Sequence, residues 1–415
     1  MRDAEARLAE AVGLTAAIGL EVIGQDIVPL ARPVPATLIG SGKVDEVGAE
    51  ARALEPDVII VNAQLSPVQQ RNLEKAWNAK VLDRTALILE IFGERAQTRE
   101  GRLQVELAHL TYQRSRLVRS WTHLERQRGG FGFLGGPGET QIETDRRLIG
   151  ERLAKIRKEI EEVKRTRGLH RSARKKVPYP IVALVGYTNA GKSTLFNALT
   201  QSDVMAKDLL FATLDPTMRG LRLPNGRRVI LSDTVGFISD LPHELVAAFH
   251  ATLEEVLEAD VILHIRDAAH DETDAQKRDV EDVLAELGIE IDGERPIVEV
   301  LNKIDLLDPE EQQGLLSHNG RKSAVAISAV TGAGVPDLLA RIEKSLGRSE
   351  VHFRLTLDPA DGAGLAWAHA HGRVTARKDR ANVLVLSVSA DPQDADRFRH
   401  RYGARLKPDM AAHPA

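Results

Sequence analysis

The chain has 415 residues, of which 43% are hydrophobic and 28% charged, and its formal net charge is −4. At about 150 residues per domain, this length predicts two or three domains. No apolar run approaches the roughly 18 residues of a transmembrane helix, and the charged N-terminus has no apolar signal core. The chain contains no cysteine, which excludes disulfide scaffolds and thiol chemistry. We therefore expect a cytoplasmic protein with no membrane span.

Residues 1–98 show alternating strand and helix patterns. Strands are predicted at residues 21–24, 58–62 and 81–83, and helices at residues 41–54 and 69–79. Because alternation of this kind favours a parallel sheet, the segment is predicted to form a small N-terminal α/β domain.

Residues 99–170 are predicted to form a basic helical hairpin. Helices at residues 101–128 and 143–167 flank a glycine-rich stretch, residues 129–138, which is predicted to be non-helical. Two helices of this length joined by a short loop pack as an antiparallel, coiled-coil-like pair. Residues 94–176 contain 21 Lys and Arg against 11 Asp and Glu, a local charge of +10. Such an excess favours a nucleic-acid partner, although a solvated, salt-bridged helical face has the same composition.

Basic and aromatic side chains of this hairpin are the candidate RNA contacts. Aromatic rings beside arginines stack on unpaired bases in many RNA complexes, but a loop that folds back on its own hairpin would use the same residues. The candidates are Arg114, Arg126, Arg128, Phe131, Phe133, Arg146 and Arg147.

Residues 178–348 carry the pattern of a doubly wound nucleotide-binding domain. Strands are predicted at residues 181–185, 229–232, 261–265, 297–301 and 324–327, and Asn225-Gly226 predicts a hairpin turn. Residues 350–405 predict a small C-terminal α+β domain, with strands at 351–357, 373–376 and 382–388 and helices at 363–371 and 392–401. The tail after Leu406 is predicted to be disordered. The fold class is thus multidomain α/β.

A phosphate-binding loop follows the first of these strands. Residues 186–193, Gly-Tyr-Thr-Asn-Ala-Gly-Lys-Ser, fit G-x-x-x-x-G-K-[ST] and run from an apolar strand into a helix. The glycines let backbone N–H groups surround a phosphate at the positive end of the helix. We expect Lys192 to reach the β- and γ-phosphates and the Ser193 hydroxyl to bind Mg²⁺.

Three further motifs follow in chain order. Asp233-Thr-Val-Gly236 ends a strand, where the carboxylate can hold Mg²⁺ through water and the glycine N–H can contact the γ-phosphate. In Asn302-Lys-Ile-Asp305, the last carboxylate can accept two N–H groups from guanine and reject adenine. Ser328-Ala329 can support guanine through a backbone N–H. Together the motifs predict a GTPase with bound GTP or GDP.

The second Mg²⁺ hydroxyl must come from the segment between the phosphate loop and Asp233. Thr213 and Thr217 are both candidates. The expected metal ligands are Ser193, Thr213 and, through water, Asp233. The expected nucleotide-binding residues are Gly186, Tyr187, Thr188, Asn189, Ala190, Gly191, Lys192, Ser193, Thr194, Phe211, Thr213, Asp233, Gly236, Asn302, Lys303, Asp305, Ser328 and Ala329.

Phe237 stands where many GTPases have the glutamine that orients the attacking water. A phenyl ring cannot do this, so either a partner stimulates hydrolysis or another group positions the water. Ser239, Asp240 and His243 are candidates in the following segment. We assign no catalytic base.

These motifs resemble those of the translational GTPases of the Obg–HflX superfamily. The segments around the phosphate loop, Phe211-Ala-Thr-Leu-Asp-Pro216, Asp233-Thr-Val-Gly-Phe237 and Asn302–Asp305 carry the resemblance, which also favours Thr213. Outside this domain, Ile39–Lys43, Arg84–Phe92 and the Gly132–Arg147 segment resemble the HflX family. The resemblance covers about residues 8–347, whereas the C-terminal segment carries no matching motif.

The resemblance implies a Mg²⁺-dependent GTPase that binds the large (50S) ribosomal subunit and its rRNA. Similar proteins dissociate ribosomes under stress, using the N-terminal region and helical hairpin near the peptidyl-transferase centre. ATP hydrolysis, known in some members, is not excluded. Two alternatives stay open: a large-subunit assembly factor, and a GTP-gated regulator whose hairpin binds a protein coiled coil. We expect a monomer in solution.

Overall fold

The computed structural model describes residues 3–127, 137–174, 179–201, 210–211, 213–214, 217–239, 250–291, 293, 295–319, 324–347, 351–380, 383–390 and 392–408. The chain divides into two compact units, Met1–Leu338 and Leu339–Ala415. Within the described ranges, no helix is both long enough and apolar enough to cross a membrane.

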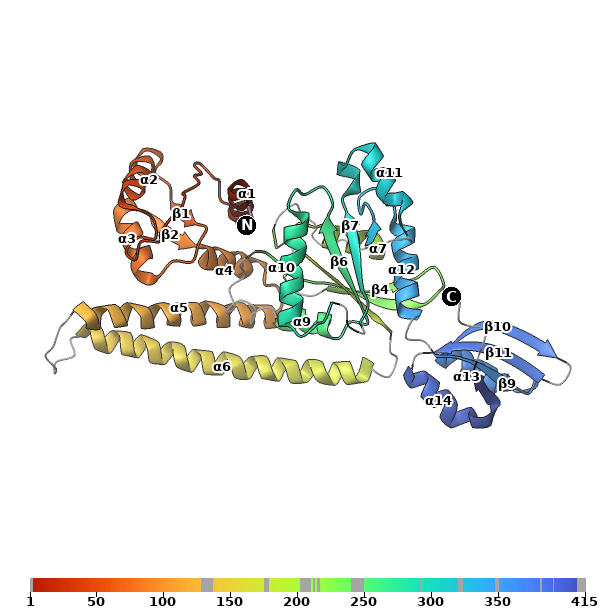
Figure 1. The fold of residues 1–415 in the computed structure, drawn as a ribbon. Helices are drawn as coiled ribbons and strands as arrows, with labels where there is room; N and C mark the ends of the chain where they lie inside the picture. The colour runs from red at the N-terminus through yellow and green to blue at the C-terminus, as the bar shows by residue number, and fades with distance from the viewer. Residues whose placement is uncertain are drawn as a thin grey trace. The chain divides into compact units, whose positions relative to one another are not determined.

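The N-terminal region contains α1 (Ala4–Ala16), α2 (Ser41–Leu54), β1 (Val58–Val61), α3 (Pro67–Trp77), β2 (Lys80–Asp83) and α4 (Arg84–Arg95) (Figure 1). Strands β1 and β2 pair in parallel, which confirms the predicted sheet direction. The strand predicted at residues 21–24 is wrong. These residues belong to no helix or strand, and Ile23 is 51% exposed. A short apolar run forms a strand only where a partner strand can accept its hydrogen bonds.

The basic segment forms two long helices, α5 (Arg99–Gln127) and α6 (Pro137–Arg174), which lie side by side (Figure 1). Leu103 packs with Ile156 and Ile160, and the Arg152 guanidinium donates to both Glu106 oxygens at 2.7 and 2.8 Å. These pairs confirm an antiparallel hairpin. The non-helical stretch was predicted to extend to residue 138, but α6 already begins at residue 137. That residue is a proline, which is favoured in the first turn of a helix. Residues 128–136 lie outside the described part.

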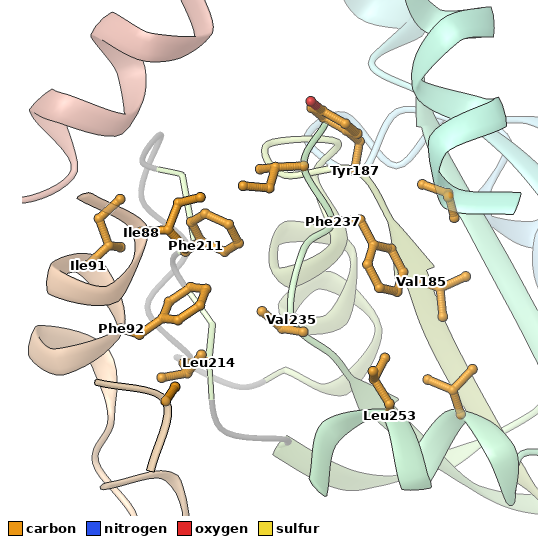
Figure 2. Close-up of a cluster of buried hydrophobic side chains, with 14 of the residues drawn as sticks. Ile88, Ile91, Phe92, Val185, Tyr187, Phe211, Leu214, Val235, Phe237 and Leu253 are labelled. Carbon is orange, nitrogen blue, oxygen red and sulfur yellow. The ribbon is translucent and has the colours of Figure 1, made fainter. Parts of the chain in front are cut away.

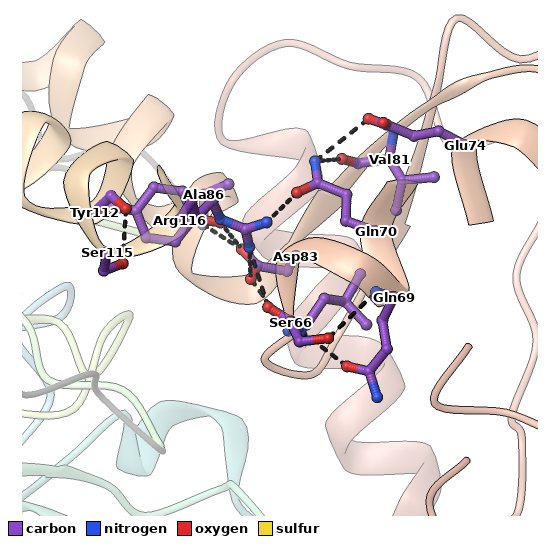
Figure 3. A network of polar contacts seen from close by, with 11 residues as sticks. Ser66, Gln69, Gln70, Glu74, Val81, Asp83, Ala86, Tyr112, Ser115 and Arg116 are labelled. Carbon is purple, nitrogen blue, oxygen red and sulfur yellow. Dashed lines mark hydrogen bonds and ion pairs between the residues drawn. The ribbon is translucent and has the colours of Figure 1, made fainter. Parts of the chain in front are cut away.

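A buried carboxylate joins the hairpin to the N-terminal sheet. Asp83 ends β2, and its side chain is fully buried. It accepts hydrogen bonds from the Arg116 guanidinium at 2.6 Å and the Tyr112 hydroxyl at 2.7 Å, both on α5 (Figure 3). It also accepts the backbone N–H groups of Leu65 and Ala86. Four donors stabilise the buried charge and fix α5 against this sheet.

The next domain has a six-stranded sheet in the order β4-β5-β3-β6-β7-β8. All neighbours pair in parallel except β4 and β5, the hairpin predicted from the Asn225-Gly226 turn. This confirms the doubly wound fold. The strands are β3 (Ile181–Gly186), β4 (Thr217–Arg222), β5 (Arg228–Asp233), β6 (Val261–Asp267), β7 (Ile297–Asn302) and β8 (Ala324–Ala326). The helices are α7 (Lys192–Thr200), α9 (His250–Leu257), α10 (Thr273–Glu286), η2 (Ile304–Leu306), α11 (Pro309–Ser317) and α12 (Val335–Gly347).

The C-terminal unit has an antiparallel sheet in the order β10-β11-β9-β12. Its elements are β9 (Val351–Leu357), α13 (Gly362–His371), β10 (Arg373–Arg380), β11 (Val383–Ala390), α14 (Pro392–Tyr402), η3 (Gly403–Arg405) and β12 (Leu406–Pro408). The α+β pattern is as predicted. The prediction of a disordered tail after Leu406 is wrong for residues 407 and 408, because they pair with β9; residues 409–415 lie outside the described part.

Candidate active site

The phosphate loop curls around a buried ammonium group. Lys192, the first residue of α7, donates from Nζ to the carbonyl oxygens of Gly186 at 3.1 Å and Tyr187 at 2.8 Å. Burial lowers the pKa of Lys192 to about 8, and the nearby Asp233 carboxylate opposes this shift. A cation at the N-terminal end of a helix is unfavourable in isolation. The charge is therefore placed where an anion would stabilise it.

Two hydroxyls and one carboxylate meet beside Lys192. The Ser193 Oγ lies 2.7 Å from Asp233 Oδ2 and 2.8 Å from Thr213 Oγ1, and Thr213 Oγ1 lies 3.0 Å from Asp233 Oδ2. Thr217, the competing candidate, lies in β4 and pairs with Asp233 only through the strand register. The structure thus brings together the predicted metal ligands and favours Thr213 over Thr217.

This oxygen cluster fits Mg²⁺, which prefers hydroxyl, carboxylate and water oxygens. Burial raises the pKa of the Asp233 carboxyl, although the Ser193 hydroxyl and Lys192 charge oppose the shift. Asp233 Oδ1 is buried and has no hydrogen-bond partner among the described residues. A divalent cation would stabilise this charge directly or through water.

Gly236 and Phe237 approach the phosphate loop closely. The Thr188 N–H donates to the Phe237 carbonyl at 2.7 Å, and the Phe237 N–H donates to the Gly186 carbonyl at 3.1 Å. A Cβ atom on Gly236 would lie 2.8 Å from Thr188 Cα and 2.9 Å from Lys192 Nζ. Only glycine fits here, and its backbone therefore lies beside the phosphate loop and the Lys192 ammonium group.

At the other end of the loop, Asn302 connects three segments. Its Nδ2 donates to the Ala190 carbonyl at 2.9 Å, and its Oδ1 accepts the Ala329 N–H at 3.0 Å. Gly191 has φ +90°, and a Cβ there would lie 2.2 Å from Asn302 Nδ2. We expected a backbone N–H of Ser328-Ala329 to support guanine, but in this structure the Ala329 N–H holds the Asn302 amide and the Ser328 N–H donates to the Ala333 carbonyl at 2.9 Å.

Asp305, the residue predicted to recognise guanine, has a carboxylate oxygen that no described group donates to. Its Oδ1 is buried and without a hydrogen-bond partner in the described part of the chain. Lys303 precedes it with φ 64°, and its ammonium pairs with Asp267 at 2.8 Å. Ser328 is buried, and its Oγ accepts the Thr331 N–H at 3.0 Å, which shapes the adjoining turn. An unpaired buried carboxylate oxygen is costly, so this site fits a ligand with N–H donors.

A polar cluster from the N-terminal helices holds the segment that follows Gly236. Glu10 of α1 accepts the Tyr187 hydroxyl at 2.6 Å and the Ser239 hydroxyl at 2.8 Å. The Ser239 N–H donates to the Tyr187 hydroxyl at 2.7 Å. Arg84, the first residue of α4, donates to the Ser239 carbonyl at 2.8 Å and lies 3.3 Å from Glu10 Oε1. The side chains of Arg84 and Glu10 are only 7% and 10% exposed, so this is a buried ion pair.

An apolar cluster also joins the N-terminal helices to the nucleotide-binding domain. The Phe92 ring of α4 meets the Phe211 ring edge to face, with centroids 4.9 Å apart (Figure 2). Phe237 is 2% exposed and belongs to the same cluster as Ile88 and Val235. Phe211 was expected near the nucleotide, but its side chain lies in this core. The Phe237 ring likewise packs in the interior.

Other predicted residues have less specific surroundings. Asn189 adopts φ 61° within the phosphate loop, and Thr194 lies in the first turn of α7. On the hairpin, Arg114 lies on α5, whereas Arg146 and Arg147 are exposed on α6. The Arg126 side chain, Arg128, Phe131, Phe133, Asp240 and His243 lie outside what the structure describes.

Sequence reasoning missed Glu10, Arg84 and Phe92. Their partners in the segment around Phe211–Ser239 are more than 100 residues away in the chain, so no local pattern reveals the contacts. The signal that was present is weak: Arg84 follows a strand directly and precedes an apolar run, which makes its burial costly unless it is paired.

Four protein-family models match the chain. They are described as GTP-binding GTPase N-terminal over residues 5–93, GTP-binding GTPase middle region over 95–174, 50S ribosome-binding GTPase over 181–303, and HflX C-terminal domain over 315–412.

Curated relatives match most of the chain. The GTPase HflX of Magnetococcus marinus is 53% identical over 393 residues, covering 94% of this chain and 90% of that protein. The GTPase HflX of Escherichia coli is 44% identical over 355 residues, covering 86% and 82%. A solved GTP-binding protein from Sulfolobus solfataricus, in complex with GDP, is 24% identical, covers 82% of this chain and 95% of that chain, and gives a TM-score of 0.44.

Proposed function

Because the chain belongs to the HflX family of GTPases, we propose that its GTP site controls binding to the large (50S) ribosomal subunit. We further propose that the bound protein dissociates ribosomes under stress, in the cytoplasm and as a monomer. The description of the matched nucleotide-binding model, a 50S ribosome-binding GTPase, supports the choice of partner.

We assign the nucleotide roles as follows. Lys192 and the backbone N–H groups of residues 191–194 bind the β- and γ-phosphates, and Gly236 contacts the γ-phosphate. Ser193, Thr213 and Asp233 would hold Mg²⁺, which neutralises phosphate charge when bound. Asp305 accepts guanine N–H groups, with Asn302 fixing its loop to the phosphate loop. The unpaired Asp305 oxygen supports guanine over adenine, because adenine offers no matching donor pair.

One observation links this site to the basic hairpin. Asp83 and Arg84 are consecutive residues at the junction of β2 and α4. Asp83 binds Arg116 of the hairpin, and Arg84 binds Ser239, three residues after Gly236. A movement of Gly236 toward a γ-phosphate would therefore act on the element that holds the hairpin. This contiguity carries the proposal of a GTP-controlled, RNA-binding hairpin.

The side chain at position 237 is one reason to expect that GTP hydrolysis requires the ribosome. Phe237 cannot orient water, and the Ser239 hydroxyl is engaged with Glu10. We propose that the large subunit completes the site, either by supplying a polar group or by moving the segment after Gly236.

The proposal is tested by incubating intact ribosomes with the protein and a non-hydrolysable GTP analogue, followed by gradient sedimentation. We expect ribosomes to shift to free subunits, with the protein on the large one, and no shift with GDP or with Lys192→Ala. Binding to large subunits without this shift would favour an assembly factor. Absence of ribosome binding, with a salt-insensitive protein partner, would favour the interaction regulator.

A further inference from the structure

Within the described part of the C-terminal unit, the helices of that unit cover one face of its sheet and none of them lies on the other. Leu355 of β9 and Leu386 of β11 point to the covered face, where they form a core with Ala368 of α13 and Phe398 of α14. Side chains alternate along a strand, so their neighbours point the other way. Among the described residues of this unit, both α13 and α14 pack on the leucine side.

The other face is basic. Alternation and register place these residues on it: His352, Arg354 and Thr356 of β9; Ala376, Lys378 and Arg380 of β10; Val383, Val385, Ser387 and Ser389 of β11; and Lys407 of β12. The set contains four Lys or Arg and no Asp or Glu. Arg354, Lys378, Arg380 and Lys407 are all exposed. Residues 351–408 as a whole contain ten Lys and Arg against six Asp and Glu, a charge of +4, in a chain whose total is −4.

Two of these cations are direct neighbours. Lys407 and Arg354 pair across β12 and β9 in the register of the sheet. Lys378 and Arg380 extend the positive charge across to the opposite edge strand, β10.

We propose that this face, defined by Arg354, Lys378, Arg380 and Lys407, binds the phosphate backbone of structured ribosomal RNA. This proposal rests on the proposed ribosome binding, and it adds a second RNA contact to the one proposed for the hairpin. Four strands spaced about 4.8 Å apart make a platform roughly 14 Å wide, which suits a backbone better than a single ion.

The chemistry of the face favours RNA backbone over bases and over protein. Among its described residues it has no Phe, Tyr or Trp, and its one aromatic ring is the imidazole of His352 at the start of β9, so it offers little surface for stacking unpaired bases. It also lacks the large apolar or aromatic anchor that dominates protein interfaces, since Val383 and Val385 are its largest apolar side chains. The hydroxyls of Thr356 and Ser387 can donate to phosphate or 2′-OH groups.

The test compares two full-length triple variants of equal charge. Lys378→Gln/Arg380→Gln/Lys407→Gln alters the face, whereas Arg397→Gln/Arg399→Gln/Arg405→Gln removes three exposed arginines from α14 and η3. Each is titrated, with a non-hydrolysable GTP analogue, against purified large subunits and against protein-free large-subunit rRNA over a salt series. A third variant, Lys378→Arg/Arg380→Lys/Lys407→Arg, keeps the charge and controls for folding.

We expect the face variant to bind both probes roughly 10- to 100-fold more weakly, with a salt slope reduced by about 2 to 3. The control and charge-retaining variants should bind like the wild type. Equal binding by face variant and wild type would overturn the proposal. A loss on subunits but not on rRNA would assign the face to an acidic ribosomal protein instead. If the wild type failed to bind subunits, the ribosomal function would fail, while the rRNA titration would still test the face.

Discussion

The guanine end and the γ-phosphate end of the proposed GTP site differ in what holds them. Asn302, Ala190 and Ala329 hold the guanine end within one domain. Glu10 and Arg84, from the N-terminal helices, hold the segment that follows the γ-phosphate glycine. The first arrangement suits constant recognition of the base. The second arrangement suits a switch, because a movement of the segment after Gly236 would alter its contacts with Glu10 and Arg84 of the N-terminal domain.

The largest expected effect is a loss of GTP affinity when the lysine that neutralises the phosphate charge is removed. Lys192→Ala should weaken GTP binding by at least about a hundredfold, because it removes charge-assisted hydrogen bonds worth roughly 1.5–3 kcal/mol each. Titration with a fluorescent GTP analogue measures this. Lys344→Ala, an exposed lysine in the last turn of α12, is the matched control. Retained micromolar affinity in Lys192→Ala would refute the phosphate-loop assignment.

The guanine end is tested by Asp305→Asn. We expect guanine nucleotides to bind about a hundredfold more weakly and xanthine nucleotides to be preferred, because the amide reverses one hydrogen bond. Competition between GDP and XDP gives the ratio. Asp308→Asn, at an exposed position three residues later, should behave like the wild type. An unchanged guanine preference in Asp305→Asn would place the base elsewhere.

The γ-phosphate end is tested by Glu10→Ala. Removing this carboxylate leaves Arg84 buried with its hydrogen bonds to Asn62 and Ser239 but without the counter-charge of Glu10, so we expect the free energy of unfolding to fall by about 3 kcal/mol. Affinity for GDP should stay within about twofold, because Glu10 lies outside the guanine end. Denaturant unfolding and GDP titration measure the two quantities, and Glu5→Ala, an exposed residue of α1, is the control. A large loss of GDP affinity with little loss of stability would contradict the division between the two ends.

The smallest effect concerns β6, which lies between β3 and β7. Burial lowers the pKa of His264 to about 4 from 6.5. The unfolded chain therefore binds a proton below pH 6.5 that the folded chain binds only below about 4, so stability falls as pH falls through this window. Between pH 7 and 5.5 the expected loss is about 1 kcal/mol.

His264→Val should remove this part of the pH dependence, whereas His369→Ala, an exposed histidine of α13, should leave it in place. Urea unfolding at the two pH values measures the difference. An identical pH dependence in wild type and His264→Val would show that His264 is not the group responsible.

The two ends also differ in how far the sequence predicted them. The guanine and phosphate motifs lie at the ends of strongly apolar strands, so their meeting followed from the parallel fold. The choice of Thr213 over Thr217 had support only from the family resemblance until the structure placed Thr213 beside Ser193. Glu10 and Arg84 were not predicted, because Ser239 is 229 and 155 residues away from them.

The errors at the strand level have a related cause. The predicted strand at residues 21–24 has no partner, and β12 exists because β9 accepts it. Whether each segment forms a strand depends on a partner strand that is distant in the sequence, and a short sequence window does not contain that information.

The most direct test of the central claim is GTP hydrolysis by the purified protein, alone and with purified large ribosomal subunits. We expect slow hydrolysis alone, since Phe237 orients no water, and stimulation of roughly tenfold or more by the large subunit. Stimulation should be absent with small subunits and with Lys192→Ala. Tight GTP binding with hydrolysis unchanged by large subunits would contradict the account.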